Sequence, residues 1–316
     1  MLPIRLPRHT FAAAMVSFVA TTATLLADTL QVDVLDVVIL PETRLVGIKV
    51  SEISGIAWDA DAGVLWAVTD KARLIRFQLS IDGDRIATFQ AETAIALTDT
   101  AGTKIDNDFF NPEGMAIING SDGDPANAEF AIVSELGPAI ARFSTSGKWL
   151  ADFEVPAPLR DPARQKSEGD GLEALTLHPV HGLVTLPEEP LLDAPRRIHT
   201  LFAGDGTSYQ FSTEAVGNTS VKALETLSNG RILLLDRMRS EDKLRLLPFL
   251  SIIDLAACKP DAPCPVVTAP VMVPGVTDAD FEGITEVSPG RFLMISDDEI
   301  NGDKRTVIAL VALGEV

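Results

Sequence analysis

The sequence predicts an all-β protein built as a single β-propeller. Apolar residues occur in short runs rich in Val, Ile, Leu and Phe, for example at 64–69, 131–134, 232–236 and 292–296. Turn residues separate these runs, and no long segment has the i, i+3, i+4, i+7 spacing of an amphipathic helix. Many short strands joined by close turns are typical of all-β domains.

An internal repeat indicates how these strands are arranged. Residues 224–236 align without a gap with residues 284–296, and the apolar, turn and Arg positions match. Gly230 and Gly290 stand in the two turns, where a positive φ is needed. The same strand–turn–strand unit occurs five times, and the residues just before each unit are Ser54, Glu113, Glu173, Lys222 and Glu282.

The spacing of the units predicts a closed ring. The five residues above are separated by 59, 60, 49 and 60 positions. The segment after Glu282 and the segment from Asp28 to Ser54 together have the length of one more unit. We therefore expect five or six blades of four-stranded antiparallel sheets, closed by the N- and C-terminal segments. A β-sandwich with accidental similarity between its strands is the alternative.

The first 27 residues are expected to be a secretory signal peptide. Arg5 and Arg8 precede an uncharged apolar run over 11–26, and Ala27 is a small residue at the expected cleavage point. The run is shorter than the ~20 residues of a membrane-spanning helix, and a membrane anchor is the alternative. These features predict one propeller domain over 28–316, periplasmic or secreted, without membrane insertion after signal removal.

The composition excludes some classes of partner. The 316 residues include 26 Lys and Arg against 45 Asp and Glu, which gives a formal net charge of -19. A nucleic acid would be repelled by this charge, and so would an anionic membrane surface. The hydrophobic share of 46% is enough for a folded core. We expect a monomer that acts on a small molecule.

The two cysteines predict a local disulfide. Cys258 and Cys264 are separated by a short Pro-containing segment, and an exported protein meets an oxidising environment. A metal-binding pair is the alternative, although no His or third Cys lies nearby in the sequence.

Two positions in each unit are expected to face the same mouth of the central channel. The inner strand of a blade runs along the channel, and the next strand returns antiparallel to it. The start of the inner strand and the end of the next strand therefore lie at the same mouth of the channel. Seven of the ten residues at these positions are carboxylates, and both cations belong to one unit. The starting positions are Ser54, Glu113, Glu173, Lys222 and Glu282, and the ending positions are Asp70, Glu135, Glu188, Arg237 and Asp297.

This mouth is predicted to bind Ca2+. Carboxylates at close range raise each other's pKa, and Ca2+, which accepts six to eight oxygen ligands, relieves their repulsion. The predicted metal ligands are Asp70, Glu113, Glu135, Glu173, Glu282 and Asp297. Lys222 and Arg237 would form a cationic wall for a phosphate or carboxylate group. Alternatively, the acids cap strands or pair with Lys71, Arg73 and Arg239.

Residues 297–303 resemble the first half of a calcium-binding loop, with oxygen-bearing side chains at alternate positions and Gly302 sixth. Position twelve is Ile308, so the segment is not an EF-hand, and an Asx-rich turn is the alternative. The motifs of serine hydrolases, zinc peptidases and nucleotide-binding loops are absent from the sequence. His178, His181 and His199 are expected to be structural.

Seven short motifs resemble the phytase-like family, a family of exported bacterial proteins described as having esterase-like activity of phytase. The resemblance extends from about Ser51 to Leu313 and implies a propeller and calcium-dependent hydrolysis of phosphoesters. Ser54, Ala174 and Pro187 depart from the repeated pattern. The motifs lie at 52–57, 111–116, 134–138, 171–175, 235–237, 280–284 and 296–298.

We therefore expect a hydrolase of small phosphate esters in which bound Ca2+ activates a water molecule. The candidate catalytic residues are Lys222, Arg237 and Glu282, with the two cations neutralising charge on the phosphate. A propeller that binds a ligand or partner without catalysis is the first alternative. A metal-dependent sugar-lactone hydrolase is the second, with Asn107, Asn111 and Asn301 as the nearest amide ligands.

Overall fold

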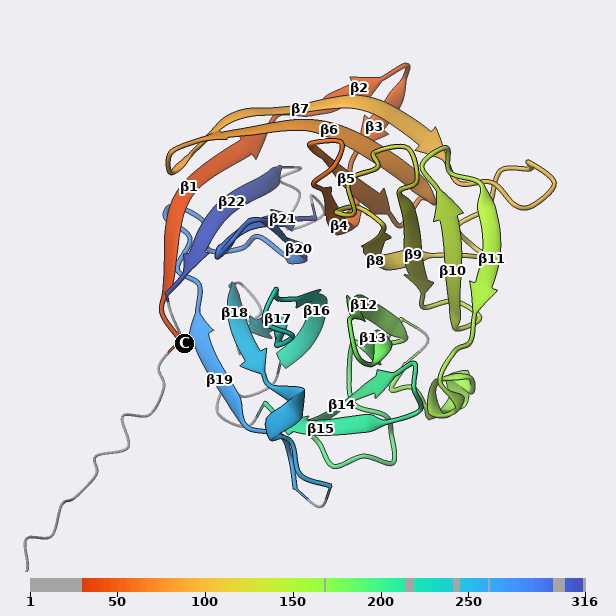
Figure 1. Ribbon diagram of the computed structural model, residues 1–316, viewed down its shortest axis with the longest axis vertical. Helices are drawn as coiled ribbons and strands as arrows, with labels where there is room; N and C mark the ends of the chain where they lie inside the picture. Colours follow the sequence, from red (N-terminus) through yellow and green to blue (C-terminus); the bar gives the residue numbers. More distant parts are fainter. Residues whose placement is uncertain are drawn as a thin grey trace, which may run out of the picture.

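Five four-stranded antiparallel sheets stand in a ring around a central axis in the computed structural model (Figure 1). The structure describes residues 30–167, 169–213, 219–240, 245–260, 262–297 and 305–314. The prediction of an all-β propeller is confirmed, with five blades, and the sandwich alternative is wrong. The predicted signal peptide lies outside the described residues, as does most of the predicted calcium loop at 297–303.

Each blade runs from an inner strand at the axis to an outer strand at the rim (Figure 1). Blade 1 contains β4 (Ile53–Asp59), β5 (Val64–Thr69), β6 (Arg73–Asp82) and β7 (Arg85–Ala96). Blade 2 contains β8 (Pro112–Ile118), β9 (Glu129–Ser134), β10 (Ala139–Ser144) and β11 (Trp149–Phe153). Blade 3 contains β12 (Leu172–His178), β13 (Gly182–Pro187), β14 (Ile198–Ala203) and β15 (Ser208–Ser212). Blade 4 contains β16 (Thr219–Thr226), β17 (Ile232–Arg239), β18 (Leu246–Ile253) and β19 (Val266–Pro270).

Blade 5 combines strands from both ends of the chain. It contains β20 (Phe281–Ser288), β21 (Arg291–Ser296), β22 (Thr306–Leu313) and, at the rim, β1 (Val32–Leu40). The pairing of β1 with β22 runs antiparallel from Val32↔Leu313 to Leu40↔Thr306. A short hairpin of β2 (Thr43–Leu45) and β3 (Ile48–Val50) links β1 to blade 1.

The hydrophobic core is divided among the contacts between neighbouring blades. Each pair of adjacent sheets packs around its own cluster of buried apolar side chains, such as Leu235 and Phe292 between blades 4 and 5. Alternate residues of every inner strand face one neighbour or the other, so the strands are apolar on both faces. The blades are therefore held at fixed positions around the axis by side-chain packing.

The disulfide between Cys258 and Cys264 is present, so that prediction is confirmed. Its two Cα atoms are 4.5 Å apart, and the bond closes the segment between η3 (Leu255–Ala257) and β19. Two further 3-10 turns, η1 (Ala157–Leu159) and η2 (Pro162–Arg164), lie between blades 2 and 3. Among the described residues, no helix has the length and apolar character to span a membrane.

Candidate functional site

A β-bulge interrupts all five inner strands at the same place. The pairing of each inner strand with its neighbour skips the residue at the starting position of the unit. A bulge turns the side chain of the extra residue out of the normal alternation. The residues left unpaired in this way include Ser54, Glu113, Glu173, Lys222 and Glu282.

The small residues that follow these positions let the inner strands approach closely. A Cβ atom on Gly114 would lie 2.5 Å from the carbonyl oxygen of Glu173, and one on Gly55 would lie 3.0 Å from the amide nitrogen of Met115. A side chain at Gly114 would require the neighbouring strand to move, and one at Gly55 would fit only tightly, so glycine permits the closest approach at these sites. Close packing of the inner strands brings the bulged residues of neighbouring blades together.

Lys222 lies at the centre of the largest cluster of charges. Its side chain is only 7% exposed, and its Nζ contacts carboxylates from blades 3 and 5. It pairs with Glu173, lies 3.0 Å from Oε2 of Glu282, and lies 3.2 Å from Oε1 of Glu188. One ammonium group on blade 4 therefore joins two carboxylates of blade 3 and one of blade 5.

Arg237 extends this cluster toward blade 5. Its guanidinium donates to Oε1 of Glu188 at 2.7 Å and pairs with the carboxylate of Asp280. It also lies 3.6 Å from Oε1 of Glu282. The predicted residues Lys222, Arg237, Glu173 and Glu282 are thus brought together, and the two cations lie among the acids, not on a separate wall.

The acids in this cluster outnumber the cations. The pKa values of several acids are shifted because the groups are buried close to other charges. Burial raises the pKa of Glu173 to about 8, although Lys222 partly offsets the effect. Burial also raises the pKa of Glu282 well above its usual range. For Glu188, burial favours a higher pKa, but Lys222 and Arg237 outweigh it and lower the pKa. Burial therefore favours the protonated forms of Glu173 and Glu282, whereas the two cations favour the ionised form of Glu188.

Lys222 stays charged despite its burial. Burial alone would lower its pKa, but Glu173, Glu282 and Glu188 raise that pKa well above the usual lysine value. The ammonium group is therefore a fixed positive charge over the whole physiological pH range.

A second group of oxygens lies on the blade 2 side of the mouth. The side-chain amide of Asn111 donates to Oε1 of Glu113 at 2.9 Å and to Oε1 of Glu135 at 2.6 Å. The Asn111 Oδ1 atom is buried and accepts no hydrogen bond from any described residue. Burial raises the pKa of Glu113 well above its usual value, and the neighbouring Glu173, Glu135 and Asp70 raise it further, against a lowering by Lys222.

The chemistry of this second group suits a hard cation. Two carboxylates and one amide oxygen without a donor are ligands of the type that Ca2+ prefers. Burial also raises the pKa of Glu135. A cation would relieve the repulsion that Glu135 exerts on Glu113. Within the part of the chain that the structure describes, no three His, Cys, Asp or Glu side chains already form a group that could hold a metal ion.

The remaining predicted residues lie at the ends of returning strands. The amide of Asp70 donates to the Glu52 carbonyl at 3.2 Å, and the Asp70 charge acts on Glu113. The amide of Asp297 donates to the Asp280 carbonyl at 2.8 Å, which places Asp297 beside the Arg237 end of the cluster. The mouth predicted from the repeat therefore collects its residues in two groups, one around Lys222 and one around Asn111.

Two residues of the site were missed by the sequence reasoning. Asn111 and Asp280 begin two of the family motifs but are absent from the predicted catalytic residues and Ca2+ ligands, yet both contact residues of the mouth. Each stands two positions before an inner bulged glutamate, in Asn111-Pro-Glu113 and Asp280-Phe-Glu282. This repeated spacing is the signal that could have identified them.

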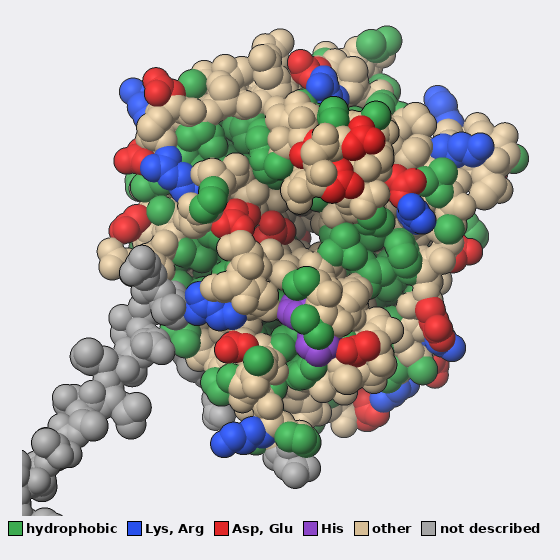
Figure 2. All heavy atoms as spheres, in the orientation of Figure 1, with side chains coloured by type: hydrophobic (Ala, Val, Ile, Leu, Met, Phe, Trp, Pro, Cys, Tyr) green, Lys and Arg blue, Asp and Glu red, His purple; other side chains and the backbone are tan. Residues whose placement is uncertain are grey.

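The histidines belong to packing contacts. His178 Nε2 bonds the Gly230 carbonyl at 2.8 Å, and His181 Nδ1 pairs with Asp205 at 2.6 Å. His199 is buried and stacks on Phe211, and burial lowers its pKa to about 4. Figure 2 shows histidine side chains near the centre of one face, among hydrophobic and acidic side chains.

Comparison with known proteins identifies one family. A sequence model described as "Phytase-like: Esterase-like activity of phytase" matches residues 48–300. No curated protein sequence matches the chain.

Similar solved structures are remote. The PQQ-bound aldose sugar dehydrogenase of Streptomyces coelicolor has 10% identity and a TM-score of 0.47 over 90% of this chain and 99% of that chain. A structural genomics protein of unknown function from Bacteroides thetaiotaomicron has 11% identity and a TM-score of 0.44 over 90% and 76%. U3-55K has 10% identity and a TM-score of 0.42 over 87% and 98%. Similarity at this level does not bear on function.

Proposed function

The chain belongs to the phytase-like family, and on that premise we propose that it hydrolyses phosphate esters with the help of bound Ca2+. The observation that carries the proposal is the surplus of carboxylates at one mouth of the propeller. Among the residues that the structure describes, Lys222 and Arg237 are the cations paired with this group of acids, and several of the acids have raised pKa values. The acids are Glu113, Glu135, Glu173, Glu188, Asp280 and Glu282.

The cation would be held on the Asn111 side of the mouth. Glu113, Glu135 and Asn111 Oδ1 would be its direct ligands, with Asp70 adding negative charge nearby. Of the other predicted ligands, Glu173 and Glu282 would not be direct ligands, since they already pair with Lys222, and Asp297 would add negative charge nearby. A bound divalent cation supplies polarisation of a phosphoryl oxygen and a more acidic water molecule.

The protein's own residues would then orient and neutralise the ester. Lys222 and Arg237 would donate hydrogen bonds to the non-bridging phosphate oxygens, exchanging part of their pairing with the carboxylates. Burial raises the pKa of Glu282 well above its usual range, which favours its protonated form. We assign it the role of donating that proton to the oxygen of the leaving alcohol.

Two other functions are favoured by particular contacts. Each cation of the mouth already has acid partners, which favours a propeller that binds a ligand without catalysis. The bridge that Asn111 forms between Glu113 and Glu135 supplies the mixed amide and carboxylate set expected of a sugar-lactone hydrolase.

An activity assay separates these three functions. Release of p-nitrophenol from p-nitrophenyl phosphate and opening of a sugar lactone would be followed with added CaCl2 and with EDTA. We expect calcium-dependent phosphatase activity that falls at least about 100-fold in Glu113→Gln, as for loss of a catalytic metal ligand. The matched control is Glu154→Gln, whose side chain is 85% exposed. Activity on the lactone alone, or on neither compound, would contradict the proposal.

A further inference from the structure

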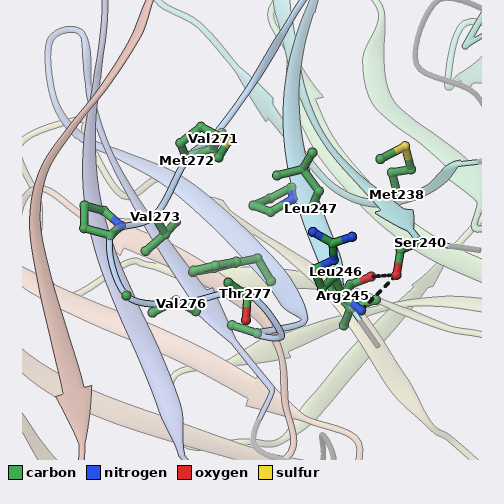
Figure 3. Close-up of a pocket in the computed structure, with 15 residues that line it drawn as sticks. Met238, Ser240, Arg245, Leu246, Leu247, Val271, Met272, Val273, Val276 and Thr277 are labelled. Carbon is green, nitrogen blue, oxygen red and sulfur yellow. Dashed lines mark hydrogen bonds between the residues drawn. The ribbon is translucent and has the colours of Figure 1, made fainter. Parts of the chain in front are cut away.

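A second concavity lies beside the mouth, between blades 4 and 5. Its volume is about 560 Å³, which is within the range of small-molecule sites. One wall comes from the end of β17 and the start of β18, and the other from the segment after β19 (Figure 3). The apolar side chains on the two walls include Met238, Leu246, Leu247, Val271, Met272 and Val276.

The walls are mainly apolar, and their polar members are Ser240, Arg245 and Thr277. Ser240 and Arg245 use polar atoms on each other, because Ser240 Oγ accepts from the Arg245 amide at 2.9 Å and donates to its carbonyl at 3.1 Å (Figure 3). Met272 is 69% exposed although its neighbours in the wall are apolar. Exposed apolar surface in a concavity marks a binding site, and methionine adapts its shape to a ligand.

The pocket and the charged mouth share their supporting elements. Met238 directly follows Arg237 on β17, and Pro248, the strand partner of Arg237, lines the pocket. On the other wall, Ala279 and Phe281 flank Asp280, whose carboxylate pairs with Arg237. Adjacent residues of a strand point to opposite faces, so the pocket and the mouth lie on the two sides of the same strand ends. A ligand that reaches over these ends would place an anionic group at the mouth and an apolar group in the pocket.

We propose that this pocket binds the apolar alcohol group of the ester whose phosphate lies at the mouth. The inference rests on the proposed function and narrows it to monoesters of apolar alcohols. In the reaction, the oxygen of water forms a new bond to phosphorus and the bond between phosphorus and the alcohol oxygen breaks. The alcohol oxygen takes up a proton, so a neutral apolar alcohol leaves the pocket.

The test compares two esters and one product. Hydrolysis of 1-naphthyl phosphate and of 2-glycerophosphate would be measured for the wild type, Met272→Asp and Val276→Phe. Binding of 1-naphthol would be measured separately by its fluorescence. The matched control is Val180→Asp, because Val180 is also an exposed apolar residue, 75% exposed, on a turn far from the pocket.

We expect KM for 1-naphthyl phosphate to rise about ten-fold or more in both pocket variants, with 2-glycerophosphate little affected. Binding of 1-naphthol should weaken in the same two variants and not in the control. Equal effects on the two esters, or 1-naphthol binding that the pocket variants do not change, would overturn the inference. If no ester is hydrolysed but 1-naphthol binding depends on the pocket, the apolar site stands and the proposed function fails.

Discussion

Replacement of Lys222 by methionine tests the charge cluster at the mouth. The substitution keeps most of the side-chain volume and removes the positive charge that contacts Glu173, Glu188 and Glu282. The side chain is only 7% exposed, so water cannot substitute for the lost ammonium group. Removal of one partner from a buried ion pair costs about 3–5 kcal/mol.

The expected loss is large enough to measure by thermal unfolding. A change of 3–5 kcal/mol corresponds to a fall in Tm of roughly 6–15 °C for a chain of this size. Unfolding would be followed by circular dichroism at pH 7.5 and at pH 5 in the presence of EDTA. The loss should be smaller at pH 5, because protonated carboxyl groups no longer require the cation.

The matched control for this prediction is Lys71→Met. Lys71 pairs with Glu52 at 3.1 Å on a more exposed part of the surface, where an ion pair contributes about 0–1 kcal/mol. A Tm of Lys222→Met within 2 °C of the control (about 1 kcal/mol or less), at both pH values, would refute the reasoning that Lys222 holds the mouth together.

Two more substitutions test Glu225, a partly buried acid on the inner strand of blade 4, and the close approach of inner strands. Burial raises the pKa of Glu225 to about 8, so the stability it gives is full below pH 4.5 and is lost as the pH rises toward 8. In the wild type, the free energy of unfolding measured in urea should fall between pH 5 and 8, and Glu225→Gln should make this fall smaller. The control is Glu42→Gln, at an exposed carboxylate. The same pH dependence in both variants would contradict the prediction. Gly114→Ala should cost about 1–3 kcal/mol because its Cβ would meet the Glu173 carbonyl. Gly169→Ala, whose Cβ would meet nothing closer than 3.7 Å, is the control, and equal Tm values for the two alanine variants would show that the strands can separate.

The fold could be predicted because each copy of the sequence repeat corresponds to one structural unit. The turn glycines and the strand pattern recur at nearly constant spacing, and each copy forms one blade. The inner strands also bulge at the position that the repeat marked as the start of each unit. The number of blades could not be fixed from the sequence, because the rim strands lack a shared motif.

The site could be predicted only in part. The repeat correctly predicted that Lys222, Arg237, Glu173 and Glu282 lie close together, because equivalent positions of the blades meet near the axis. It did not show that Lys222 lies among the acids, because the reach of a long side chain across blades depends on packing. Glu188 was counted at the mouth without a role, yet it bridges Lys222 and Arg237.

The pocket beside the mouth could not be predicted from the sequence repeat. Its walls come from the end of β17, the start of β18 and the segment at 271–279, and these meet only when blades 4 and 5 pack together. A periodic pattern reports what the units share, whereas this pocket depends on a segment that one unit alone contains.

Direct binding of calcium tests the central claim most clearly. EDTA-treated, dialysed protein would be titrated with CaCl2 by calorimetry for the wild type, Glu113→Gln and the control Glu154→Gln. We expect saturable binding to the wild type and the control, and affinity at least about ten-fold weaker in Glu113→Gln. No binding to the wild type, or equal affinity in all three proteins, would contradict a cation site at this mouth.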